Sequence, residues 1–196
     1  MKLLEKHNIL PLDVIRYINE FVKYKELNDK TIRIAVKLWF INKEKCKIKY
    51  GHISYWNVSN VTDMSSLFCE CDFFNEDISR WNVSNVTNMS GIFSGAYSFN
   101  CDLSKWNVSN VTDMSCMFFE ATSFNSDISN WNVEKVTVMV FMFYRASSFN
   151  CDLSKWKVSN RTSTYCIFFK SNFTKYDFFS NYFGYRKIPQ WIKKCV

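Results

Sequence analysis

The chain has 196 residues, of which 47% are hydrophobic and 18% aromatic, so it can bury a core as one domain. Its net charge of +7 is uneven: residues 1–50 carry +6, residues 51–160 carry −5 and residues 161–196 carry +6. The acidic middle disfavours nucleic-acid binding, which needs a basic surface along the body of the protein. Only two histidines occur, with no P-loop, GxSxG or HExxH motif, which disfavours an enzyme.

The first 50 residues are predicted to form a helical N-terminal cap. Between residues 10 and 24 apolar side chains recur on one helical face, and Pro11 and Asp13 suit the start of a helix. This face comprises Val14, Ile15, Ile18, Phe21 and Val22. The segment resembles the opening helix of F-box segments, a resemblance that implies docking to a ubiquitin-ligase scaffold. A capping helix and a ligase-docking helix are the two alternatives.

A second helix is predicted from Asn28, which can cap it, to Phe40. Its apolar face consists of Ile32, Ala35, Val36 and Trp39. We expect this face to close the first unit of the repeats that follow. The lysine-rich stretch 43–49 is expected to be a solvated connector.

Residues 51–164 contain five copies of a 25-residue repeat. The clearest copy runs from Asp77 to Asn100 and reads DISRWNVSNVTNMSGIFSGAYSFN. Five tryptophans, each 25 residues from the next, mark the repeat: Trp56, Trp81, Trp106, Trp131 and Trp156. A fixed period of this kind indicates stacked coils, because one coil cannot bury its own apolar side.

Two periodicities are mixed within one repeat. Met89, Phe93 and Ala96 have the spacing of a short helix, whereas the segments around Trp81 and Val86 are rich in β-branched and aromatic residues. The repeat therefore predicts a leucine-rich-repeat-like β-solenoid with short strands and a short helix in each coil. Residues 165–196 lose the register and are predicted to form an aromatic C-terminal cap, with an exposed aromatic binding patch as the alternative.

Stacking should align equivalent residues in columns that form the core. Besides the tryptophans, the expected columns are Phe68, Phe93, Phe118, Phe143 and Phe168, and Met64, Met89, Met114 and Met139. Two polar columns accompany them: Asn75, Asn100, Asn125 and Asn150, and Asp77, Asp102, Asp127 and Asp152. Calcium binding is one interpretation of the polar columns, but Asx turns or ladders between coils are favoured. No cofactor or metal is expected.

The cysteines do not follow a disulfide or zinc pattern. Cys101 and Cys151 share a phase two coils apart, as do Cys116 and Cys166, which places each pair about 10 Å apart and beyond the reach of a disulfide. We therefore expect reduced and mostly buried thiols.

Variable positions beside the core columns are candidate partner contacts. One set, just before each tryptophan, comprises Arg80, Lys105, Asn130 and Lys155. A second set, just after each phenylalanine of the Phe68 column, comprises Glu70, Ser94, Glu120 and Tyr144. Ordinary solvated surface is the alternative for each of these residues.

The repeats resemble the BspA-like leucine-rich repeat family, whose units read close to FNxDISxWxVSNVTxMSxMFxxAxSFN. Similar relatives occur among mycoplasma and other bacterial surface proteins and in large DNA viruses. The resemblance covers Asn28 to about Thr164. It implies a right-handed solenoid used for adhesion or protein binding, with no catalytic residues. The last copy departs from the pattern at Thr164 and Thr174.

These features predict a non-enzymatic structural or protein-binding scaffold, with an F-box-like ligase adaptor as the alternative. Residues 1–7 contain no apolar signal core, and no run of residues reaches membrane-spanning length. The residue bias towards Asn, Lys, Ile and Phe suggests an AT-rich genome. We therefore expect a protein of the cytoplasm or of a large-virus particle whose partners are other proteins.

Overall fold

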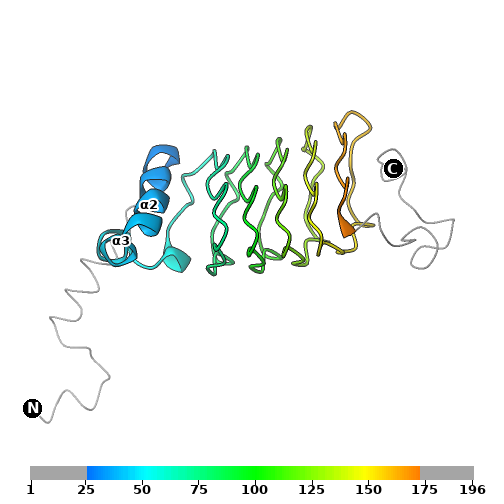
Figure 1. Ribbon diagram of the computed structural model, residues 1–196. Helices are drawn as coiled ribbons and strands as arrows, with labels where there is room; N and C mark the ends of the chain where they lie inside the picture. The colour runs from blue at the N-terminus through cyan, green and yellow to red at the C-terminus, as the bar shows by residue number, and fades with distance from the viewer. Residues whose placement is uncertain (1–25, 173–196) are drawn as a thin grey trace, which may run out of the picture.

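The computed structural model describes residues 26–172. The F-box-like segment at 10–24 and residues 173–196 of the predicted C-terminal cap lie outside the described residues. Figure 1 shows two helices, α2 and α3, at one end of a row of stacked coils that continues to the last described residues.

Helix α2 spans Asp29–Ile41 and begins with a capping box. The Asn28 side chain accepts from the backbone N–H groups of Lys30 and Thr31, and the Thr31 hydroxyl accepts from the Asn28 N–H. The buried residues of α2 are Ile32, Ala35, Val36 and Trp39. They face the first coil, where the rings of Trp39 and Trp56 meet edge to face at 6.0 Å.

The lysine-rich stretch that the sequence suggested to be a connector is helical. Helix α3 spans Lys43–Tyr50; Asn42 caps it, Cys46 and Tyr50 are its buried residues, and Gly51 follows with a φ of 75°. Lysine and glutamate are good helix formers, and the Cys46 thiol of α3 donates to the Ala35 carbonyl of α2 at 3.4 Å. The short 3₁₀ helix η1, Ile53–Tyr55, then leads into the first coil.

The coils are joined by isolated parallel bridges 25 residues apart. These bridges link Asp63 to Asn88, Asn88 to Asp113, Asp113 to Val138 and Val138 to Ser163. A further bridge pairs Asn28, at the start of α2, with Asn60 of the first coil. The helical cap is thus hydrogen-bonded to the stack as if it were a preceding coil.

The prediction of a β-solenoid is wrong. Residues 26–172 contain α2, α3 and η1 but no strand, and the predicted helix from Met89 to Ala96 is a succession of turns. In these turns Ile92, Ser94 and Ala96 donate their N–H groups to the carbonyls three residues earlier. The alternate residues donate to the next coil instead, as when Phe93 donates to Met117.

Left-handed residues explain why neither a helix nor a strand forms there. Gly91 and Gly95 have φ values of 60° and 69°, and in every other described coil non-glycine residues take the same conformation. These are Ser66 and Glu70, Cys116 and Glu120, Phe141 and Arg145, and Cys166 and Lys170. A left-handed residue cannot continue an α-helix, and it redirects the backbone so that every second N–H points along the stack.

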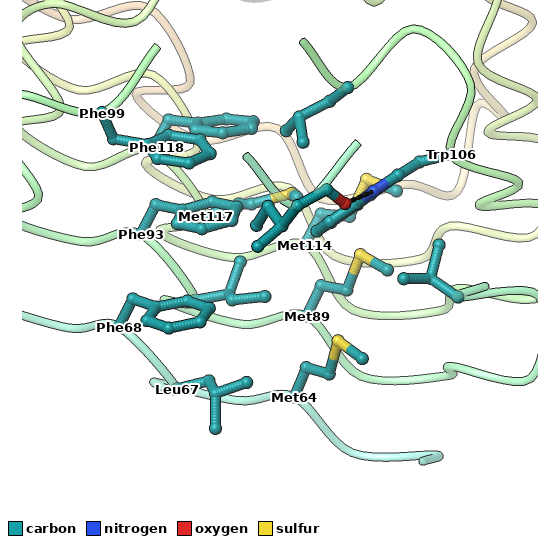
Figure 2. Close-up of a cluster of buried hydrophobic side chains, with 14 of the residues drawn as sticks. Met64, Leu67, Phe68, Met89, Phe93, Phe99, Trp106, Met114, Met117 and Phe118 are labelled. Atoms are coloured by element: carbon teal, nitrogen blue, oxygen red, sulfur yellow. Dashed lines mark hydrogen bonds between the residues drawn. The ribbon is translucent and has the colours of Figure 1, made fainter. Parts of the chain in front are cut away.

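The core consists of columns of identical side chains, as Figure 2 shows for Met64, Met89 and Met114 and for Phe68, Phe93 and Phe118. Successive rings of the Phe68 column lie 5.6 to 5.7 Å apart and nearly parallel. A second column, which the sequence analysis did not identify, comprises Phe74, Phe99, Phe124 and Phe149. Each of its rings stacks on the first column within the same coil, at 3.8 Å for Phe93 and Phe99.

Four of the five tryptophans of the column join two coils through the indole N–H. Trp106 donates to the Ile78 carbonyl at 3.1 Å, drawn as a dashed line in Figure 2, and Trp81, Trp131 and Trp156 repeat this bond at 2.9 to 3.0 Å. Trp56 has no coil before it and donates to Gly51. A buried tryptophan in this position therefore supplies both apolar area and a hydrogen bond to the neighbouring coil.

The polar columns satisfy backbone groups. The Asn125 side chain accepts from the Asn150 N–H at 2.8 Å, and Asn75 and Asn100 do the same for their next coils. The aspartates form Asx turns, in which Asp102 accepts from the N–H of Ser104. This hydrogen bond lowers the pKa of Asp102, and similar bonds to serine lower the pKa values of Asp77 and Asp127.

Two charged residues of α2 replace the backbone of a missing coil. Between coils, Thr87 donates its N–H back to the Thr62 carbonyl, but Thr62 has no earlier coil and donates to the Asp29 carboxylate at 2.7 Å. In the turns each coil donates its N–H groups to carbonyls of the next coil, as Ser66 does to Ser90. The equivalent carbonyl of the first coil, that of Ser65, has no preceding coil to donate to it. The Arg33 guanidinium donates to it at 2.8 Å.

Seven of the eight cysteines lie within residues 26–172, and all seven are free thiols. Cys46 and Cys101 are buried, and the others are partly exposed, so the thiols are less buried than expected. The Cys151 sulfur accepts from the Ile128 N–H, and burial raises the pKa of this thiol to about 11. Within this part of the chain no group of three His, Cys, Asp or Glu residues is placed to hold a metal ion.

Replacing a tryptophan of the column should separate packing from hydrogen bonding. We expect Trp106→Ala to lower the free energy of unfolding by about 3 to 5 kcal/mol, because it leaves a cavity and an unpaired carbonyl. Trp106→Phe should cost about 1 to 3 kcal/mol, mainly through the unpaired Ile78 carbonyl. Chemical denaturation measures both values, and equal stability of Trp106→Ala and the parent would contradict the stacked core.

Replacing Asp29 should show the effect of pH on the cap. Burial raises the pKa of Asp29. Hydrogen bonds from the backbone N–H groups of Asp63 and Thr62, together with the nearby Arg33, lower this pKa by more than burial raises it, so it lies below the ordinary 3.8. A carboxylate with a lowered pKa stabilises the fold above its unfolded pKa and loses this effect as the pH falls through its folded value. Asp29→Ala should therefore melt below the parent at pH 7, and the difference should shrink below about pH 4. Asp72→Ala, at an exposed carboxylate of the first coil, is the control and should melt like the parent at both pH values.

Candidate binding surface

The candidate contacts before the tryptophans are spread along one exposed edge. Arg80 lies over the ring of Tyr55, and Lys155 donates to the Asn130 side chain at 3.2 Å. Lys105 is exposed between them. Shallow depressions of about 280 and 340 Å³ lie along this edge and are lined mainly by polar residues. This edge has the character of ordinary solvated surface.

The candidates after the phenylalanines belong to two different columns. Glu70 and Glu120 occupy the left-handed position, where Gly95 stands between them, whereas Ser94 and Tyr144 occupy the position before it. The Glu70 carboxylate lies over Gly95, where an added Cβ would meet it at 2.8 Å. The four residues of this predicted set therefore do not form a single column: Glu70 and Glu120 share one turn position, and Ser94 and Tyr144 share another.

At the other end of the stack, aromatic residues gather around Tyr144. Its ring stacks on Phe119 at 4.7 Å and on Phe169 at 5.6 Å, so three coils contribute to one ladder. Phe141 meets Tyr144 and Tyr165 edge to face at 5.8 and 5.5 Å. We call Phe119, Phe141, Tyr144, Tyr165 and Phe169 the aromatic face.

The aromatic face is open to solvent and bordered by charges. The exposed fraction is 69% for Tyr165 and 49% for Phe169. Glu120 accepts from Arg145 at 2.7 Å, and this hydrogen bond raises the pKa of Arg145, whose guanidinium also lies over Tyr144. Lys170 lies over Phe169 at 5.6 Å. A hydrogen bond with the Cys166 side chain raises the pKa of the Tyr165 phenol.

The repeat itself does not require these aromatic residues. Equivalent turn positions in the first two coils hold small residues, namely Ser66, Cys69, Gly91 and Ser94. Those coils have the same inter-coil hydrogen bonds as the later ones. Tyr144 was a predicted partner contact, and Tyr165 and Phe169 fall within the aromatic patch that was the alternative for residues 165–196. Phe119 and Phe141 were not predicted, although Phe119, Tyr144 and Phe169 follow one another at the 25-residue interval.

Replacing the stacked Tyr144 should destabilise the fold more than replacing the exposed Tyr165. We expect Tyr144→Ala to lower the free energy of unfolding by about 1 to 2 kcal/mol, because the ring loses stacking on both faces. Tyr165→Ser should change it by less than about 0.5 kcal/mol, because most of this side chain is already in water. Denaturant titration of both variants measures the difference. A larger loss for Tyr165→Ser would show that this ring is buried by another part of the chain.

The candidate contacts thus resolve into a polar edge and an aromatic face. Among residues 26–172 no helix is long and apolar enough to cross a bilayer. No curated protein and no solved structure matches the chain. A family model matches residues 36–139 and again residues 106–182, which together span the second half of α2, helix α3, the coils and the aromatic face. On this match the chain belongs to the repeat family described as "Mycoplasma protein of unknown function, DUF285".

Proposed function

We propose that this chain is a non-enzymatic repeat scaffold that binds another protein through the aromatic face. The observation that carries the proposal is the gathering of five aromatic side chains on turns that the repeat can build with serine, glycine and cysteine. Tyrosine, phenylalanine and arginine are enriched where proteins meet, and clustered aromatic residues dominate binding energy.

The ladder geometry favours a protein partner over a nucleic acid. Tyr144 already stacks on Phe119 and Phe169, so its ring faces are covered and mainly the ring edges are presented to a partner. Single-stranded nucleic acids need open ring faces beside a basic groove. Here Arg145 is paired with Glu120, and residues 51–160 carry a net charge of −5.

The resemblance to BspA-like proteins supports the same class of function. The chain belongs to a repeat family, and repeat proteins commonly bind partners along their extended surfaces. The resemblance to BspA-like proteins is the basis for proposing an adhesion or structural role. A place in the cytoplasm or in a large-virus particle stays a prediction from composition. The absence of enzymatic activity is likewise part of the proposal.

The test is affinity purification of the full chain from its native source, with mass spectrometry of the retained proteins. The variant Tyr165→Ser with Phe169→Ser removes the exposed part of the aromatic face. The matched control, Lys105→Ser with Lys155→Ser, changes two exposed residues of the polar edge. We expect a partner that both the parent and the control retain and that the aromatic variant loses by at least about tenfold, the effect of about 1.4 kcal/mol.

Two results would contradict the proposal. Retention of every partner by the aromatic variant would exclude the aromatic face as the contact. Loss of a partner by the lysine control alone would move the contact to the polar edge. Melting curves of both variants check that each one is folded.

A further inference from the structure

Helix α2 has a second apolar stripe on the side of the helix opposite its buried residues. The exposed fraction is 56% for Ile34 and 71% for Ile41, and Leu38 lies half-buried between them. These residues are spaced by four and three positions and therefore lie on one face of the helix. A helix with apolar stripes on both sides is usually covered on both sides. Within residues 26–172 this stripe is only partly covered: Leu38 packs against the edge of the core, and Ile41 borders a depression that Leu67 and Cys71 of the first coil also line.

The chain that enters α2 comes from a segment with a matching pattern. Within residues 10–24, Val14, Ile18 and Phe21 have the same spacing of four and three positions. Only residues 25–28 separate this segment from the first residue of α2. Two helices joined by so short a connection pack as antiparallel neighbours.

We propose that residues 10–24 cover the outer stripe of α2 as an antiparallel amphipathic helix. The segment lies outside the described residues, and its helical character is the expectation from its sequence. The two stripes match in an antiparallel register with these pairs: Val14 with Ile41, Ile18 with Leu38, and Phe21 with Ile34. A 15-residue helix is about 22 Å long and α2, with 13 residues, about 20 Å, so each stripe finds its partner along the whole contact.

Charge supports the same arrangement. Lys30 and Lys37 flank the outer stripe of α2, and neither makes an ion pair within residues 26–172. Asp13 and Glu20 flank the stripe of the N-terminal segment. Successive residues are about 100° apart around a helix, and viewed from each N-terminus the two lysines and the two acidic residues lie on the same, counterclockwise side of their stripes. When two helices pack antiparallel, these two sides lie next to each other. In the register given above, Glu20 comes nearly level with Lys37, so its carboxylate would face a lysine that makes no ion pair within residues 26–172.

The alternative occupant, a second copy of α2 and α3, is disfavoured by charge. Residues 26–50 carry seven basic and three acidic side chains. Two such surfaces would repel each other, and like charges brought together oppose association. The N-terminal segment instead offers acidic residues beside apolar ones.

A double-mutant cycle on the full chain tests the register. Phe21→Ser and Ile34→Ser should each lower the melting temperature by about 3 to 6 °C. The double variant should melt no lower than the worse single variant, because both changes remove one contact. Ile48→Ser, at a residue of α3 that is 72% exposed, is the control and should add independently to Phe21→Ser. Losses that add in the first pair, or no loss from Phe21→Ser, would overturn the proposal.

Charge reversal gives a second readout. Lys37→Glu should speed amide exchange of residues 12–22, and adding Glu20→Lys should restore protection. Fast exchange throughout this segment in the parent chain would show that it is not docked. A concentration-dependent dimer that Ile34→Asp dissociates would assign the stripe to a second copy and overturn the proposal. None of these results depends on the aromatic face.

Discussion

The structure depends on backbone hydrogen bonds that run between coils in two opposite directions. At the corner, each coil donates back to the one before it, as Thr112 does to Thr87. In the turns each coil donates forward, as Met114 does to Val138. Neither set can form within a single coil, so the backbone of one repeat is satisfied only when a neighbour is present on each side. Stacking is therefore a requirement of the polar backbone as well as of the apolar core.

This constraint explains which side chains repeat and what the cap must supply. Tryptophan and asparagine recur because each covers a core position or a corner and also hydrogen-bonds the adjacent coil. The first coil has no predecessor, so α2 supplies an acceptor through Asp29 and a donor through Arg33. A purely apolar cap would supply neither partner, and these backbone groups at the exposed edge of the first coil would depend on water instead.

The period, the stacked columns and helix α2 could be read from the sequence, because each rests on the spacing of large apolar residues. The conformation of the coil could not. Met89, Phe93 and Ala96 have helical spacing, but the spacing comes from turns around two left-handed residues. At Phe141 or Arg145 nothing in the residue type signals a positive φ; only Gly91 and Gly95 hint at it. Phe119 and Phe141 of the aromatic face could not be predicted for a related reason: the equivalent positions of other repeats hold different residue types, so neither belongs to a constant column.

Because the junctions between coils are alike, the number of coils sets the length of the stack. Every coil repeats the same contacts with its neighbours, so a gene that gains or loses a whole 25-residue unit preserves each junction and changes only the length. The helical cap and the aromatic face would then move apart or together in steps of one coil, about 4.8 Å. Partners held at these two places would be spaced in fixed increments, and copy number rather than point mutation would set the distance between them.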